Sequence, residues 1–222
     1  MRKNVFLLVL LLSGWVLAAE PLEAWEQFME QERLLLDQLE EARRELPPEV
    51  FSELLSEQAR WYERREQSAR YTSHLPGMDD MDESEYWYAL SVQDRARSEW
   101  ISAWRFTYSP AAAELDDWEG WWLDGEGGHL IVTRSKPDSF EFSISVVRGP
   151  TFHLGELDGN ARIDGRSAEF RITPEGTEDE TVLRFSRDGP FLVLEGENTW
   201  YWHGVRAYFD GRYLRGSAAT DD

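Results

Sequence analysis

Two hydrophobic periodicities divide the chain. Up to about residue 109, apolar side chains recur every three or four positions, which is the spacing of one buried face on an α-helix. Beyond about residue 118, apolar and polar residues alternate, as in a strand with one buried face. The first pattern predicts helices over residues 21–46, 49–70 and 84–108, and the second predicts a set of short strands.

Prolines and turn residues set the limits of the three predicted helices. They stand at Pro47-Pro48, Pro76-Gly77 and Ser109-Pro110. The second helix is expected to be the central packing helix, with an apolar stripe of Phe51, Leu54, Leu55, Ala59, Trp61, Tyr62 and Ala69. Three amphipathic helices with short connections most economically form an antiparallel bundle.

The alternating pattern is clearest in Phe140–Val146, where each apolar residue is followed by Glu141, Ser143 or Ser145. The other predicted strands cover residues 119–123, 130–134, 152–157, 168–173, 181–186, 191–195 and 205–208, with a closing segment at 212–215. Asp-Gly pairs typical of hairpin turns begin at Asp124, Asp158, Asp164, Asp188 and Asp210. The expected fold class is therefore α+β: a three-helix antiparallel bundle followed by an antiparallel β-barrel or meander of about eight strands.

The first residues have the composition of a secretory signal. Arg2 and Lys3 precede the apolar run Val5–Leu12, and Ala18 and Ala19 stand where a signal peptidase would cut. The run is shorter than the roughly 20 apolar residues of a membrane span, so we expect an exported protein, periplasmic or extracellular, without a span in the mature chain. The expected organisation is a signal peptide at 1–19, a helical domain at 20–109, a linker at 110–117, a β-domain at 118–216 and a disordered tail at 217–222.

The chain is strongly acidic, with 43 Asp and Glu against 23 Lys and Arg, a formal net charge of −20. Removal of Arg2 and Lys3 with the signal would leave 21 basic side chains and a charge of 21 − 43 = −22. Phosphate binding needs clustered cations, so no nucleic-acid partner is expected. Opposite charge favours a basic protein or a cation as partner. Acidity that only keeps an exported protein soluble is an equal alternative.

Catalytic and metal-binding motifs are not evident in the sequence. There is no cysteine, hence no thiol nucleophile, no zinc-finger spacing and no disulfide, and the histidines stand far apart, at His74, His129, His153 and His203. The segment from Asp158 begins like a calcium loop, but Arg162 takes a ligand position and no acid closes the loop. We therefore expect no metal, no cofactor and no enzymatic activity. A hydrolase that uses paired carboxylates is the remaining enzymatic alternative.

One candidate surface for a partner is the acidic connection between the second and third helices. Its acids are Asp79, Asp80, Asp82 and Glu83, and a basic protein could dock there. The alternative is a solvated connector.

The other candidate surface is the aromatic segment Trp200, Tyr201, Trp202 and His203. Three consecutive aromatic residues cannot all face one side of a strand, so at least one is expected to be exposed or to cover an end of the barrel. The alternative is that they cap the core or pack on the helices. Trp118, Trp121 and Trp122 raise the same question and are assigned to the interface between the domains.

The second helix contains the pattern Gln58-x-x-Trp61-x-x-x-Arg65-Glu66, and the third helix has Arg95 about one turn before its aromatic part. With a leucine-rich first helix, this order resembles the N-terminal domain of LprI-type lysozyme inhibitors over about residues 20–108. In that family a cysteine often follows the arginine by four positions and pairs with one that enters the third helix. This chain has Ala69 at the first place and no cysteine at the second.

The resemblance implies a helical domain in which Trp61 and Arg65 pack and form ion pairs between helices. Gln58, Glu66 and Arg95 belong to the same family pattern and are expected to be structural. Residues 148–159 and 208–215 are similar to β-domains appended to this helical domain in bacterial envelope proteins, which implies a barrel. The implied function is stoichiometric binding of a basic partner such as lysozyme. The alternative is an envelope binding module whose barrel holds a small apolar ligand or docks on another envelope protein.

Overall fold

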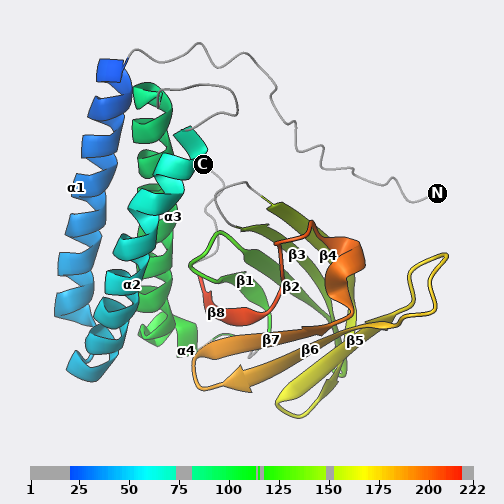
Figure 1. Ribbon diagram of the computed structural model, residues 1–222. Coiled ribbons are helices and arrows are strands. Elements are labelled where there is room, and N and C mark those ends of the chain that lie inside the picture. The colour runs from blue at the N-terminus through cyan, green and yellow to red at the C-terminus, as the bar shows by residue number, and fades with distance from the viewer. Residues whose placement is uncertain (1–20, 74–81, 114, 116–117, 149–152, 217–222) are drawn as a thin grey trace, which may run out of the picture.

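A helical bundle lies against one side of a closed β-barrel in the computed structural model, which describes residues 21–73, 82–113, 115, 118–148 and 153–216 (Figure 1). The helices are α1 (Pro21–Glu45), α2 (Pro48–Ser73), α3 (Glu83–Thr107) and the short α4 (Pro110–Ala113). The strands are β1 (Gly120–Leu123), β2 (His129–Lys136), β3 (Ser139–Arg148), β4 (His153–Asp164), β5 (Ser167–Ile172), β6 (Thr181–Asp188), β7 (Phe191–Glu197) and β8 (Gly211–Arg215), with a 3₁₀ turn η1 (Thr199–Trp202) before β8. The predicted α+β fold is confirmed.

The bundle consists of α1 and α3 side by side and parallel, with α2 antiparallel to both (Figure 1). Side-chain hydrogen bonds show that α1 and α3 run in the same direction. Gln38 of α1 accepts from Ser102 of α3, and further along both helices Glu45 accepts from Arg105. Asp82 caps α3, because its carboxylate accepts from the backbone N–H groups of Ser84 and Glu85 at 2.9 and 3.1 Å. The start of α1, the end of α2 and the start of α3 therefore meet at one end of the bundle.

The barrel is an antiparallel meander in which every strand pairs with the next, and β8 closes onto β1 through Trp122 and Leu123. Inward side chains fill it, as expected for eight strands. They include Trp122, Leu130, Phe140, Phe142, Ile144, Phe185, Phe209 and Tyr213. The alternation predicted for residues 140–146 is confirmed in β3, where Phe140, Phe142, Ile144 and Val146 are all buried.

Three local predictions for the barrel were wrong. Residues 205–208 are not a strand but part of the connection from η1 to β8, and Val205 is 97% exposed. The pair Asp158-Gly159 is not a turn but lies within β4. A Cβ on Gly159 would stand 2.4 Å from the Phe170 ring, so only glycine fits there. The pair Asp210-Gly211 is not a hairpin turn either, because Asp210 ends the connection from η1 and Gly211 is the first residue of β8.

One hydrophobic cluster joins the bundle to the barrel. Trp104 of α3 meets Phe191 of β7 edge to face, with ring centroids 5.5 Å apart, and Leu214 of β8 belongs to the same cluster. Trp121 packs against this cluster as predicted, but Trp118 and Trp122 belong to the barrel core instead. Adjacent residues of a strand face opposite sides, so Trp121 and Trp122 of β1 cannot both reach the interface. No helix in the described part of the chain is both long and apolar enough to cross a membrane.

Candidate functional site

The predicted acidic surface is only partly within the described residues. Asp79 and Asp80 lie outside them. Asp82 uses its carboxylate to cap α3, and Glu83 is the first residue of that helix. Both lie at the end of the bundle where α1 begins.

The predicted aromatic surface divides into an exposed half and a packed half. Trp200 and Tyr201 in η1 are 58% and 48% exposed. Trp202 packs against the barrel core and its Nε1 donates to Thr181 Oγ1 at 3.0 Å, while the His203 ring is hydrogen-bonded to Thr199 at 3.0 Å. Figure 1 shows η1 on the side of the barrel away from the helices, so the acidic and aromatic surfaces are separate.

A third surface, which the sequence analysis did not identify, runs along α1. Leu22, Trp25, Met29 and Leu36 are 38–67% exposed and lie on one face of the helix, and together they are called here the α1 stripe. The turn between Met29 and Leu36 carries Glu32 and the exposed Arg33, which pairs with Asp37. Glu26 and Glu30 are exposed at positions adjacent to the stripe on the helix surface. Trp25 also meets Trp87 of α3, with ring centroids 4.7 Å apart, which fixes its ring at the edge of the bundle.

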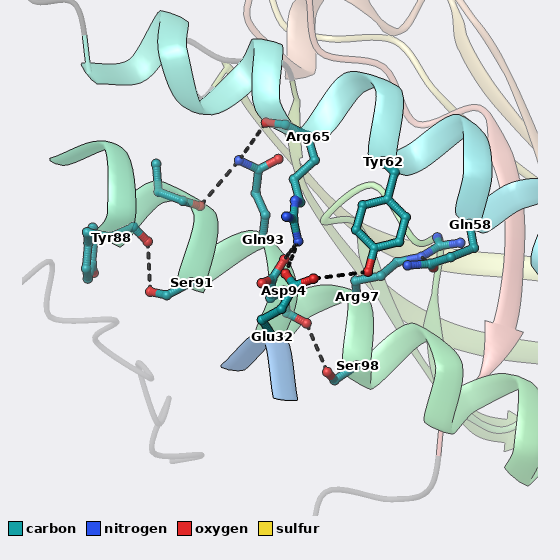
Figure 2. A network of polar contacts seen from close by, with 11 residues as sticks. Glu32, Gln58, Tyr62, Arg65, Tyr88, Ser91, Gln93, Asp94, Arg97 and Ser98 are labelled. Carbon is teal, nitrogen blue, oxygen red and sulfur yellow. Dashed lines mark hydrogen bonds and ion pairs between the residues drawn. The ribbon is translucent and has the colours of Figure 1, made fainter. Parts of the chain in front are cut away.

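Inside the bundle, the family-pattern residues build a buried polar network (Figure 2). Arg65 Nη1 lies 2.5 Å from Glu32 of α1 and 2.6 Å from Asp94 of α3, so one arginine holds two carboxylates. Burial, and the neighbouring Glu32, raise the pKa of Asp94 to about 7 even though Arg65 acts in the opposite direction. The ion pairs join all three helices at one point.

Arg97 is the second arginine of this network. Its Nε donates to Gln58 Oε1 at 2.7 Å, and Figure 2 shows it reaching from α3 past Tyr62 to Gln58. The Trp61 ring lies between the two guanidinium groups, 5.3 Å from that of Arg65 and 5.5 Å from that of Arg97.

The other two family-pattern residues lie outside the network. Glu66 pairs with Arg70 on the surface of α2 at 2.5 Å. Arg95 is exposed on the surface of α3. The helical period turns position 95 outward and brings Arg97, one turn after Asp94, onto the buried face.

A cleft of about 830 Å³ separates the bundle from the barrel. On the helical side it is lined by α2 and by Arg97 and Trp100 of α3. On the barrel side it is lined by the β1–β2 connection, the end of β3, the middle of β7, and the start of β8 with the connection before it. Gly125 of that connection has φ +70°, and a Cβ there would stand 2.8 Å from the Trp100 ring. Glycine therefore lets the barrel approach α3 closely at this edge of the cleft.

The barrel side of the cleft carries a buried ion pair between Arg148 and Asp124. Arg148 Nε donates to the carbonyl of Tyr208, and the Tyr208 ring covers the guanidinium at 4.7 Å. The Tyr208 hydroxyl donates to Glu126, which also pairs with Arg64 of α2 at 2.8 Å. These contacts tie the barrel side of the cleft to the bundle.

Comparison of the chain with known proteins identifies no family to which it belongs. No protein-family model matches the chain, and neither do the curated proteins or the solved structures. Among the described residues, no group of three or more His, Asp or Glu side chains is arranged to hold a metal ion. The arrangement therefore offers recognition surfaces: a stripe on α1, exposed aromatics on η1 and a cleft with buried arginines.

Proposed function

We propose that this is an exported binding protein that captures a basic protein in a stoichiometric complex, with lysozyme as the partner that the LprI resemblance suggests. The observation that carries the proposal is the α1 stripe beside Glu26 and Glu30. Exposed apolar side chains supply the contact that excludes water, and the flanking carboxylates match lysines and arginines of a basic partner.

The mechanism is occlusion without any bond being broken. The net charge of −20 attracts a basic enzyme and speeds encounter. The stripe then holds the complex, and the acids at the start of α3, Asp82 and Glu83, extend the contact at the same end of the bundle. Because the attraction is electrostatic, added salt slows association.

The direct test is a turbidity assay of cell-wall lysis by chicken-type lysozyme with the purified mature chain. Inhibition at molar excess and low salt, weakening as salt is added, is the expected result. Full lysis under those conditions removes lysozyme as the partner.

A pair of matched variants tests the α1 stripe itself. Met29→Lys with Leu36→Lys places two cations on the stripe and should weaken inhibition at least about tenfold, since tenfold corresponds to about 1.4 kcal/mol and two contacts are lost. Leu55→Lys on α2 with Leu154→Lys on the barrel makes the same charge change at two other exposed leucines. Equal loss in both pairs would assign the effect to net charge instead of the stripe.

The second candidate is an envelope module that docks on another protein through the barrel. It is supported by the exposure of Trp200 and Tyr201. The barrel interior is occupied by its own aromatic side chains, so docking is favoured over an apolar ligand held inside. Mass spectrometry of protein purified under native conditions distinguishes a module that docks on another protein from one that holds an apolar ligand. A retained apolar molecule would favour the ligand-binding module.

A further inference from the structure

Arg97 is a buried cation for which no anion lies within ion-pair distance among the described residues. It is 4% exposed, its Nε is bonded to the neutral amide of Gln58, and its Nη2 has no hydrogen-bond acceptor in the described part of the chain. Glu57 lines the same cleft, but its carboxylate accepts from Trp100 Nε1 at 3.3 Å. A buried charge without a partner is strongly unfavourable, so the position calls for an anion.

Arg148 lines the same cleft from the barrel side. It is 2% exposed, and Asp124, the Tyr208 carbonyl and the Tyr208 ring fix its guanidinium. Its Nη1 has no acceptor among the described residues. Because the Arg148 guanidinium is held through Nε and Nη2, Nη1 is already oriented before any ligand binds.

The other charged groups of the cleft limit what it can accept. Arg64 is paired with Glu126 and Arg212 with Glu53, and Asp210 accepts from the backbone of Gly196. Further charges on the lining are Arg60, Glu57, Glu63 and Glu195. These three carboxylates would repel a polyanion, whereas a molecule with one anionic group can reach the arginines.

We propose that this cleft binds a small molecule that carries an oxyanion, a carboxylate or a phosphate, with Arg97 and Arg148 as its charged donors. Guanidinium groups suit both anions because their N–H groups match two oxygens at once. A volume of about 830 Å³ is within the range of small-molecule sites. No residue of α1 lines the cleft, so this site is independent of the partner surface proposed above.

The test is calorimetric titration of the full mature chain with inorganic phosphate and, separately, with the monocarboxylate propionate, at matched ionic strength. We expect saturable binding at one site for at least one probe, and the probe that binds identifies the class. Trp100 lines the cleft, so its fluorescence provides an independent signal. Absence of saturable binding for both probes overturns the proposal.

Two variants with opposite expected effects separate a binding role from a structural one. Arg97→Gln should lower affinity at least about tenfold, as expected when a charged hydrogen bond is lost, while Arg95→Gln, the same change at the exposed position two residues earlier on α3, should leave it unchanged. Glu57→Gln removes a repelling carboxylate, keeps an acceptor for Trp100 and should raise affinity. Unchanged affinity in Glu57→Gln overturns the proposal even if Arg97→Gln does not fold, as does wild-type affinity in a folded Arg97→Gln.

Discussion

Replacement of Asp94 by asparagine should change how stability depends on pH. Asp94 is fully buried, with one oxygen 2.6 Å from Arg65 and the other without a partner among the described residues. Its pKa rises from 3.8 to about 7, mainly because burial disfavours the charged form. Asparagine keeps the shape of the protonated acid and cannot ionise.

The direction of the effect follows from proton linkage. The folded pKa lies above the unfolded one, so between them the folded protein binds more protons and its free energy of unfolding falls as pH rises. The stabilisation is fully present below pH 3.8 and is lost as pH rises through about 7. Each pKa unit corresponds to about 1.4 kcal/mol, so about two units between pH 5 and the folded pKa predict a loss of about 2–3 kcal/mol.

Urea unfolding followed by tryptophan fluorescence at pH 5, 6, 7 and 8 measures this loss. Other titrating groups contribute to both proteins, so the informative quantity is the difference between variant and wild type. That difference should move in favour of Asp94→Asn by about 2–3 kcal/mol from pH 5 to 8. Asp37→Asn, the same change at an exposed position on α1, shows what the loss of one surface carboxylate does by itself. Parallel curves for wild type and Asp94→Asn would refute the reasoning.

Three further changes test the packing. Trp61→Ala should lower the free energy of unfolding in urea by about 3–5 kcal/mol, since a buried ring that contacts two guanidinium groups is lost. Partner binding should be retained. Full stability with lost binding would make Trp61 a recognition residue. Asp124→Asn should also cost about 3–5 kcal/mol, because it leaves Arg148 buried without its carboxylate, and calorimetric unfolding should show a lower midpoint. Gly159→Ala should cost about 1–3 kcal/mol through the clash with Phe170; wild-type stability there would mean that the barrel interior has room.

The helical part could be predicted as a set of helices but not as a site. In α2, the apolar stripe correctly included Leu54, Trp61 and Ala69 as buried residues, whereas Leu55 and Ala59 are exposed. The positions that complete the buried face are polar, at Gln58 and Arg65. A stripe defined by hydrophobicity passes over them, and only the strict 3.6-residue period shows that they face inward.

In α3, the 3.6-residue period also marks Arg97, the arginine that lines the cleft, as a buried residue. Leu90, Asp94, Arg97, Ile101 and Trp104 follow one another at three and four positions, and all five are buried. Two charged residues within an otherwise apolar stripe indicate a buried polar network. The cleft itself could not be predicted in this way, because Arg97 of the bundle and Arg148 of the barrel line one cleft only through the contact between bundle and barrel.

That contact decides whether the two arginines can act as one site. An oxyanion bound by two donors requires both to be fixed, since each loose side chain would have to be ordered on binding. Gln58 and the Trp61 ring hold Arg97 within the bundle, while Asp124 and Tyr208 hold Arg148 on the barrel. The hydrophobic cluster formed by α3, β7 and β8 then fixes the position of the bundle relative to the barrel. The Gln58-x-x-Trp61 pattern, which by sequence marks only the helical domain, thus positions one of the two donors of a cleft between domains.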